Sequence, residues 1–167
     1  NVGFFSLLAS VLAGDDGHVY AFEPLPRNIN FLRKHIAINQ RKNIDVFEAA
    51  VSDHNGQAFF DLGASTAMGH LAESGEIQVE MVSLDEMIAE GSIKPPDYIK
   101  LDVEGAEFEA LSGAQKLLAQ FHPTLFIDTH HREAHQKSVD LLKGLGYSFQ
   151  CLDGKNLDET KEVLAKY

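Results

Sequence analysis

Acidic and imidazole side chains gather at two places where an apolar run ends. The first is "YIKLDVEGAEFEALSGAQKLL" (98–118), in which a short apolar strand leads directly into Asp102 and Glu104. Two carboxylates at the end of a buried strand can meet a cationic ligand group or a metal, or take up a proton. The other reading is plain capping, because Glu104 and Glu107 also suit the positive end of the helix that follows.

The second place is "DTHHREAH" (128–135), which carries three histidines. His131 and His135 are four residues apart and would share a helix face, but this spacing is common by chance, and we predict no metal site. One of His130 and His131 is instead expected to act as a general base, since an imidazole titrates near neutral pH. The candidate catalytic residues are therefore Glu104, His130 and His131.

A glycine and an acid near the start of the chain have the spacing of a nucleotide site. Gly3 precedes a helical pattern, and Glu23 ends the apolar run "HVYAFE". A carboxylate at a strand end can accept hydrogen bonds from both ribose hydroxyls, and a glycine lets the backbone approach a ligand closely. The alternatives are a helix N-terminal charge for Glu23 and an ordinary helix start at Gly3.

Strand and helix patterns alternate along the chain. Apolar alternation and β-branched runs predict strands over 18–23, 44–51, 77–84, 98–101, 123–131 and 147–152. Apolar spacings of three and four predict helices over 3–13, 25–36, 108–118 and 133–143, with a shorter one from Ser83 or Asp85 to Ala89. This order predicts an α/β fold with a mostly parallel, twisted sheet and helices on both faces, and ligands bind such sheets beyond the carboxyl ends of the strands.

Two departures from this alternation lie in the middle of the chain. Asn55-Gly56 is a strong hairpin signal, so the strand that ends at Val51 is expected to continue into an antiparallel excursion. The small and polar residues 62–76 predict a mobile loop.

Composition excludes several classes of protein. The 167 residues carry a net charge of −11, which disfavours a nucleic-acid partner because phosphate binding needs clustered Lys and Arg. No apolar run reaches the roughly 20 residues of a membrane span, and the single Cys151 fits a reducing compartment. We expect one domain, 1–167, in a cytoplasmic protein.

Five stretches stand in an order and spacing that resembles the FkbM family of S-adenosylmethionine-dependent methyltransferases. They are "NVGFFSLLAS", "VYAFEPLPRN", "AVSDHNG", "VSLDEM" and "PDYIKLDVEGAEFEALSGAQKLL", and the resemblance covers roughly residues 1–130. It implies a Rossmann-like class I methyltransferase fold, with one antiparallel strand near the C-terminal edge of the sheet. It further implies S-adenosyl-L-methionine as cofactor and a hydroxyl acceptor on a sugar or a polyketide-like small molecule.

The resemblance also implies roles for nine residues. The methionine-binding loop would contain Asn1 and Gly3, and Glu23 would hold the ribose. The remaining cofactor-binding residues would be Pro24 and Asn28 near the adenosine, Ala50, Val51 and Ser52 along the adenine, and Asp102 facing the methionine or the acceptor.

Both ends of the sequence depart from the family pattern. In the family, a strand with an acid and further glycines precedes the loop and would form the centre of the sheet, whereas this sequence begins at Asn1. At the other end, "CLDGKNLDETKEVLAKY" is too polar and too helical in pattern for an obvious last strand. We therefore expect a fragment, or a partner (for instance a homo-oligomer) that supplies the missing pieces.

Two other functions fit part of the sequence. An NAD(P)-dependent oxidoreductase shares the Gly-to-acid spacing, but it would want a plain βαβ continuation in place of "HNG" and a catalytic Tyr–Lys or His pair, and none stands out. A non-catalytic Rossmann-like domain that has lost its cofactor is the second alternative, because the glycine loop is cut short.

Overall fold

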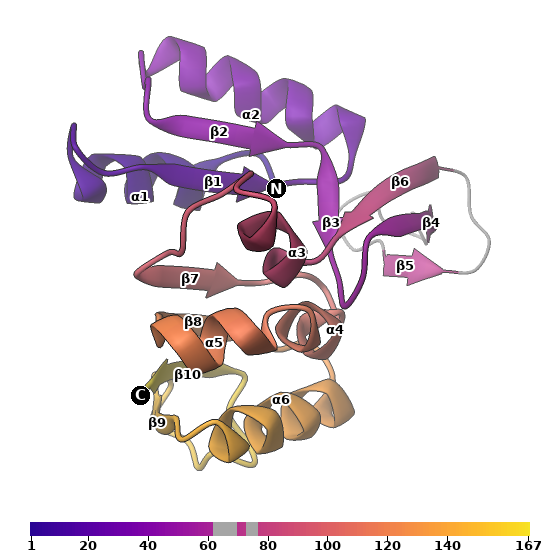
Figure 1. The fold of residues 1–167 in the computed structure, drawn as a ribbon, viewed down its shortest axis with the longest axis vertical. Helices are drawn as coiled ribbons and strands as arrows, with labels where there is room; N and C mark the ends of the chain where they lie inside the picture. The colour runs from indigo at the N-terminus through magenta and orange to yellow at the C-terminus, as the bar shows by residue number, and fades with distance from the viewer. Residues whose placement is uncertain (62–69, 73–76) are drawn as a thin grey trace.

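Helices and strands alternate along most of the chain in a computed structural model, which describes residues 1–61, 70–72 and 77–167 (Figure 1). The helices are α1 (Phe4–Ala13), α2 (Pro26–Ile38), α3 (Leu84–Ala89), α4 (Glu107–Ser112), α5 (Gln115–Phe121) and α6 (Arg132–Gly144). The strands are β1 (Val19–Phe22), β2 (Ile44–Phe47), β3 (Ala49–Val51), β4 (Gly56–Asp61), β5 (His70–Ala72), β6 (Ile77–Val82), β7 (Tyr98–Leu101), β8 (Thr124–Asp128), β9 (Ser148–Cys151) and β10 (Glu162–Lys166). No helix among the described residues is long and apolar enough to cross a bilayer.

The strands pair in three groups, with three parallel and four antiparallel pairings. β1 is parallel to β2, β3 to β6, and β7 to β8, while the antiparallel pairs come from β4, β5 and β10. "Mostly parallel" is therefore a loose description of the whole, although the arrows of β1, β2 and β7 point the same way in Figure 1. Within the part of the chain that the structure describes, β1 pairs only with β2 and β7 only with β8, so each keeps one edge without a strand partner.

The polar C-terminal tail does form a strand, contrary to the expectation from its composition. β10 lies between β8 and β9 and is antiparallel to both, as the resemblance implies for a strand near this edge. Val163 and Ala165 are buried, whereas Glu162 and Lys166 are exposed. This alternation has the period of a strand, but it spans only five residues next to the polar "LDETK", and the short pattern is easily overlooked.

Two local predictions in the middle of the chain hold only in part. The strand expected over 44–51 is two strands, β2 and β3, with the exposed Glu48 between them. The antiparallel excursion after Val51 is confirmed, since β4 is antiparallel to β6 and β6 is parallel to β3, but β3 and β4 do not pair directly. The Asn55 side chain instead accepts a hydrogen bond from the Ser83 backbone, at 2.8 Å. Of the predicted loop 62–76, residues 70–72 form β5 and the others lie outside the described residues.

The predicted helix 108–118 is broken at Gly113 into α4 and α5. A Cβ at Gly113 would lie 2.0 Å from the carbonyl oxygen of Ser52, because the backbone directly after β3 packs against the glycine. The side chain of Asp85, in α3, caps the N-terminus of α5. Its two carboxylate oxygens accept hydrogen bonds from the backbone N–H groups of Lys116 and Leu117 at 2.9 and 2.8 Å. The core lies beneath these helices, where Leu118, Leu125, Leu142 and Ala165 are wholly buried.

Replacing Gly113 by alanine should destabilise the fold strongly. The added methyl group would overlap backbone atoms, which cannot move aside as a flexible side chain can, so we expect a loss of about 3 kcal/mol or more in the free energy of unfolding. Urea denaturation measures the loss. Gly144→Ala is the control: nothing lies within 4 Å of its Cβ position, and alanine is the better helix former. Equal stability of the two variants would contradict the packing at Gly113.

Candidate active site

The turn after β7 and the end of β8 bring acids and a histidine together. Because β7 and β8 are parallel neighbours in register from Tyr98–Thr124 to Leu101–Ile127, the residues that follow them lie at one edge of the sheet. Asp102 follows β7 directly, and His130 comes two residues after the end of β8. The parallel strands therefore place Asp102 and His130 at one sheet edge, as expected from the sequence.

A buried carboxylate orients His130. Oε1 of Glu107 lies 2.9 Å from Nδ1 of His130 and accepts the Gly105 N–H at 2.9 Å. Glu107 is 0% exposed, and its other oxygen, Oε2, has no hydrogen-bond partner among the described residues. The reading of Glu107 as a helix cap is thus incomplete. It is the first residue of α4 and shares the buried face with Ala110 and Leu111, so a carboxylate at an apolar position was the signal available in the sequence.

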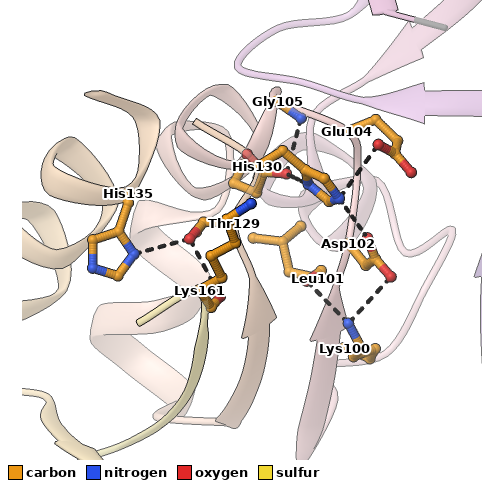
Figure 2. A network of polar contacts seen from close by, with 10 residues as sticks. Lys100, Leu101, Asp102, Glu104, Gly105, Thr129, His130, His135 and Lys161 are labelled. Atoms are coloured by element: carbon orange, nitrogen blue, oxygen red, sulfur yellow. Dashed lines mark hydrogen bonds and ion pairs between the residues drawn. The ribbon is translucent and has the colours of Figure 1, made fainter. Parts of the chain in front are cut away.

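The other ring nitrogen of His130 faces two further carboxylates (Figure 2). Nε2 lies 3.3 Å from Oε2 of Glu104 and 3.6 Å from Oδ1 of Asp102, whose Oδ2 is 3.5 Å from Nζ of Lys100. Burial acts to lower the pKa of His130, but the hydrogen bond to Glu107 and the charges of Glu104 and Asp102 outweigh it and raise that pKa above its ordinary value. The site therefore favours positive charge at His130.

The backbone of the β7–α4 turn takes an unusual conformation to present Glu104. Glu104 has φ of +52° and Gly105 has φ of +106°, two consecutive left-handed residues. Left-handed backbone is disfavoured for a residue with a Cβ and is found where the surroundings impose it. His131 packs onto Gly105, where a Cβ would lie 2.8 Å from its ring. The three predicted catalytic residues are therefore neighbours: Glu104, His130 and His131. The strained backbone is that of Glu104.

The predicted nucleoside residues form a second cluster around Glu23 at the end of β1. Glu23 is 5% exposed, and its Oε1 accepts hydrogen bonds from the Leu25 N–H at 2.9 Å and the Asn28 side chain at 3.2 Å. The backbone nitrogen of Asn1 contacts Oε2 of Glu23. Pro24, half-buried, follows in the same turn. The structure thus brings Asn1, Glu23, Pro24 and Asn28 together.

Gly3 begins α1 in a conformation that only glycine adopts easily. Its φ is +108°, and a Cβ there would lie 2.7 Å from the Leu32 side chain of α2. Gly3 is thus a helix start that packs closely on Leu32, and its approach to a ligand stays a prediction.

The start of α1 lies close to the acids after β7. The Phe5 ring lies 5.2 Å from Nζ of Lys100. Lys100 in turn contacts Asp102. The helix that Gly3 precedes therefore borders the Lys100–Asp102 pair.

The remaining predicted residues, 50–52, lie in β3 and directly after it. Ala50 and Val51 are half-buried in β3, and Ser52 is 3% exposed, with its N–H bonded to Val82 at 2.8 Å. No hydrogen bond or ion pair among the described residues joins them to Glu23 or Asp102. Val51 packs on the main core, as Phe22 beside Glu23 and Val103 beside Asp102 also do.

A hollow of about 160 Å³ opens on the other side of the histidines. Its lining includes His130, His131, Arg132 and Lys161, but neither Glu23 nor Asp102. His135 also borders it, yet both of its ring nitrogens are bonded, to Thr129 at 2.9 Å and to the Leu157 carbonyl at 2.7 Å. His135 is therefore not available to bind a metal together with His131.

The fold is that of Rossmann-like methyltransferases. A methyltransferase FkbM from Methylobacillus flagellatus superposes with a TM-score of 0.63 at 20% identity, over 98% of this chain and 40% of that one. The methyltransferase FkbM domain model matches residues 1–149, and the chain belongs to this family. The family expected from the sequence is confirmed, and membership speaks against the oxidoreductase alternative.

Two curated relatives are also similar. The chain is 30% identical over 135 residues to the 2-O-methyltransferase NoeI of Sinorhizobium fredii, covering 69% of this chain and 54% of the relative. It is 27% identical over 120 residues to the hexuronic acid methyltransferase AglP of Haloferax volcanii, covering 71% and 48%. The chain thus spans about half the length of the curated relatives it matches.

Glycine at position 104 should be tolerated better than alanine. Both substitutions remove the carboxylate, but glycine also relieves the left-handed backbone, so we expect Glu104→Gly to be about 1 kcal/mol more stable than Glu104→Ala in urea denaturation. The matched control is the same pair at Asp102, which is not among the residues with positive φ. There, alanine should be the more stable. The same order at both positions would mean that residue 104 is not strained.

Proposed function

We propose that this domain is an S-adenosylmethionine-dependent methyltransferase that methylates a hydroxyl group of a sugar or a related small molecule. The observation that carries the proposal is the buried carboxylate of Glu23 at the end of β1, which is turned toward the Leu25 N–H and the Asn28 side chain. A nucleoside would bind at Glu23, and the reacting group would lie near Asp102. Family membership supports the same reaction class.

The residues at the first cluster fit the cofactor. Glu23 is a buried carboxylate at the end of a parallel strand, and Gly3, which has no side chain, immediately precedes α1. We propose that Glu23 holds the ribose, that Asn1 and Gly3 hold the methionine part, and that Pro24 and Asn28 lie near the adenosine. The adenine contacts are proposed for Ala50, Val51 and Ser52. When bound, this cofactor supplies a methyl group on a positively charged sulfur that leaves as a neutral thioether.

The second cluster would act on the acceptor. Transfer to a hydroxyl requires that its oxygen be oriented toward the methyl carbon and that its proton be removed. His130 is committed to Glu107, and Glu104 faces His130, whereas His131 is exposed and packs on Gly105. We therefore propose that His131 takes the proton of the acceptor hydroxyl. Asp102, Glu104 and His130 would determine the electrostatic potential around the acceptor.

The hollow beside the histidines supports a polar acceptor. Arg132 and Lys161 line it together with Asp158 and Glu159, which suits a molecule rich in hydroxyl or carboxyl groups. About 160 Å³ is less than the roughly 300 Å³ of a small ligand site, so the hollow would hold only part of an acceptor. The name of one relative, a 2-O-methyltransferase, agrees with transfer to oxygen, and that of the other, a hexuronic acid methyltransferase, agrees with a sugar acid as acceptor.

Glu23→Ala should weaken binding of S-adenosylhomocysteine by roughly 1 to 3 kcal/mol, because charge-assisted hydrogen bonds to the ribose are lost. Isothermal titration calorimetry measures the change. Glu90→Ala, which removes an exposed acid at the end of α3, is the control and should bind as the wild type does. Unchanged affinity in a folded Glu23→Ala variant would put the ribose elsewhere. No heat from the wild type at millimolar ligand would favour the non-catalytic alternative.

His131→Ala should slow methyl transfer on the order of 100-fold while leaving the affinity for S-adenosylhomocysteine unchanged, since the residue is proposed to act on the acceptor proton alone. Transfer of a radiolabelled methyl group to a uronic acid acceptor measures turnover, and calorimetry measures affinity. The control is His18→Ala, another exposed histidine, at the start of β1. Full turnover by His131→Ala would remove it as the base.

A further inference from the structure

We propose that Asp102, Glu104 and His130 bind a divalent metal cation. Each residue offers one ligand atom, and the three atoms lie within 4.8 Å of one another. The two carboxylates come from the turn after β7 and the imidazole from the end of β8, so the sheet holds them on one side (Figure 2). Cation binding goes beyond the proposed methyl transfer and is tested without it.

The hydrogen bond to Glu107 leaves the lone pair of His130 pointing at two acids. Oε1 of Glu107 accepts the Gly105 N–H, so it acts as an acceptor and Nδ1 of His130 must donate to it. A neutral imidazole has one N–H, which is then used. Its Nε2 lone pair would face the oxygens of Glu104 and Asp102, and this arrangement is repulsive unless a proton or a metal cation lies between them.

The distances favour a metal cation over a shared proton. Nε2 is 3.3 Å from Glu104 and 3.6 Å from Asp102, longer than the roughly 2.8 Å of a charge-assisted N–H···O bond. Two ligand atoms that are each about 2.1 Å from one ion lie about 3.0 to 3.4 Å apart in octahedral or tetrahedral geometry. The two distances from Nε2 are close to this spacing, and the three ligand atoms together lie within 4.8 Å.

Glu107 supplies an independent observation. Metal-binding histidines usually donate their second ring N–H to a carboxylate, which orients the ring toward the ion. Glu107 does this from a fully buried position, and its Oε2 has no hydrogen-bond partner among the described residues. A buried carboxylate with an unpartnered oxygen is costly unless positive charge lies nearby. His130 is the group in contact with Glu107, so a cation bound at its Nε2 would bring positive charge to this side of the carboxylate.

The donor set selects the kind of cation. Carboxylate oxygens suit Mg²⁺ and Mn²⁺, and an imidazole nitrogen favours a transition metal, so two oxygens with one nitrogen fit Mn²⁺ and its first-row neighbours best. Three protein ligands leave coordination positions open to water or to an acceptor hydroxyl. If the proposed function holds, the cation would make that hydroxyl more acidic.

Titration of the protein with MnCl2 in a calorimeter, without cofactor or acceptor, tests the site. We expect one Mn²⁺ per chain. Asp102→Asn, Glu104→Gln and His130→Gln should each lower the affinity about tenfold or more, since each removes a protein ligand. Glu107→Gln should lower it about 10- to 100-fold although Glu107 does not touch the ion. The matched control is Asp45→Asn, which removes a carboxylate from the exposed His18–Asp45 pair and should bind as the wild type does.

A second measurement guards against misfolded variants. Mn²⁺ at millimolar concentration should raise the Tm of the wild type and of Asp45→Asn more than that of the three ligand variants, whose circular dichroism should match the wild type. No heat and no rise in Tm with either Mn²⁺ or Zn²⁺ would overturn the proposal, as would ligand variants that bind like the wild type. Loss of S-adenosylhomocysteine binding with Mn²⁺ binding intact would overturn the proposed function alone.

Discussion

The contact between the buried carboxylate of Glu107 and Nδ1 of His130 determines the geometry of the candidate site. It joins residues 23 positions apart, one at the start of α4 and the other after β8. The same oxygen accepts the Gly105 N–H, so the turn that carries Glu104 is attached at the same point. Moving any one of these groups would displace the others, because the carboxylate is enclosed and cannot reorganise through water.

The charges and the backbone of the site lower the free energy of unfolding, and they do so where the chemistry is expected. Three carboxylates surround one imidazole, and one of them, Glu107, is fully buried, which costs free energy unless its charge is compensated. Glu104 adds a left-handed backbone to this cost. Strain and unbalanced charge at one sheet edge are features that folding alone does not explain, and they are common at catalytic and binding sites. The Glu23 cluster differs, since its acid is satisfied by local donors from Leu25 and Asn28.

Much of this arrangement could be predicted from the sequence, because it follows from local periodicity and from the order of elements. Apolar spacing predicted α1, α2 and α6, and the rule that parallel strands end at one edge predicted that Asp102 and His130 would meet. Long-range pairing was harder to predict: the local signal at Asn55-Gly56 favours a hairpin, but β6 pairs with both β3 and β4. The break at Gly113 depends on contact with Ser52, and no local pattern contains that information. The position of Glu107 at the start of a helix indicates a cap in the sequence. That its side chain is buried becomes evident only when the packing partners of α4 are known.

The central claim is that Glu107 fixes His130 with its proton on Nδ1 and Nε2 facing the acids. Nitrogen-15 NMR of the histidine ring, with His130 assigned by comparison with His130→Gln, tests this claim directly. We predict a proton on Nδ1 both before and after one equivalent of Zn²⁺, with the shift of Nε2 alone changing on addition of the metal. A neutral ring that carries its proton on Nε2, with Nδ1 bare, would contradict the account.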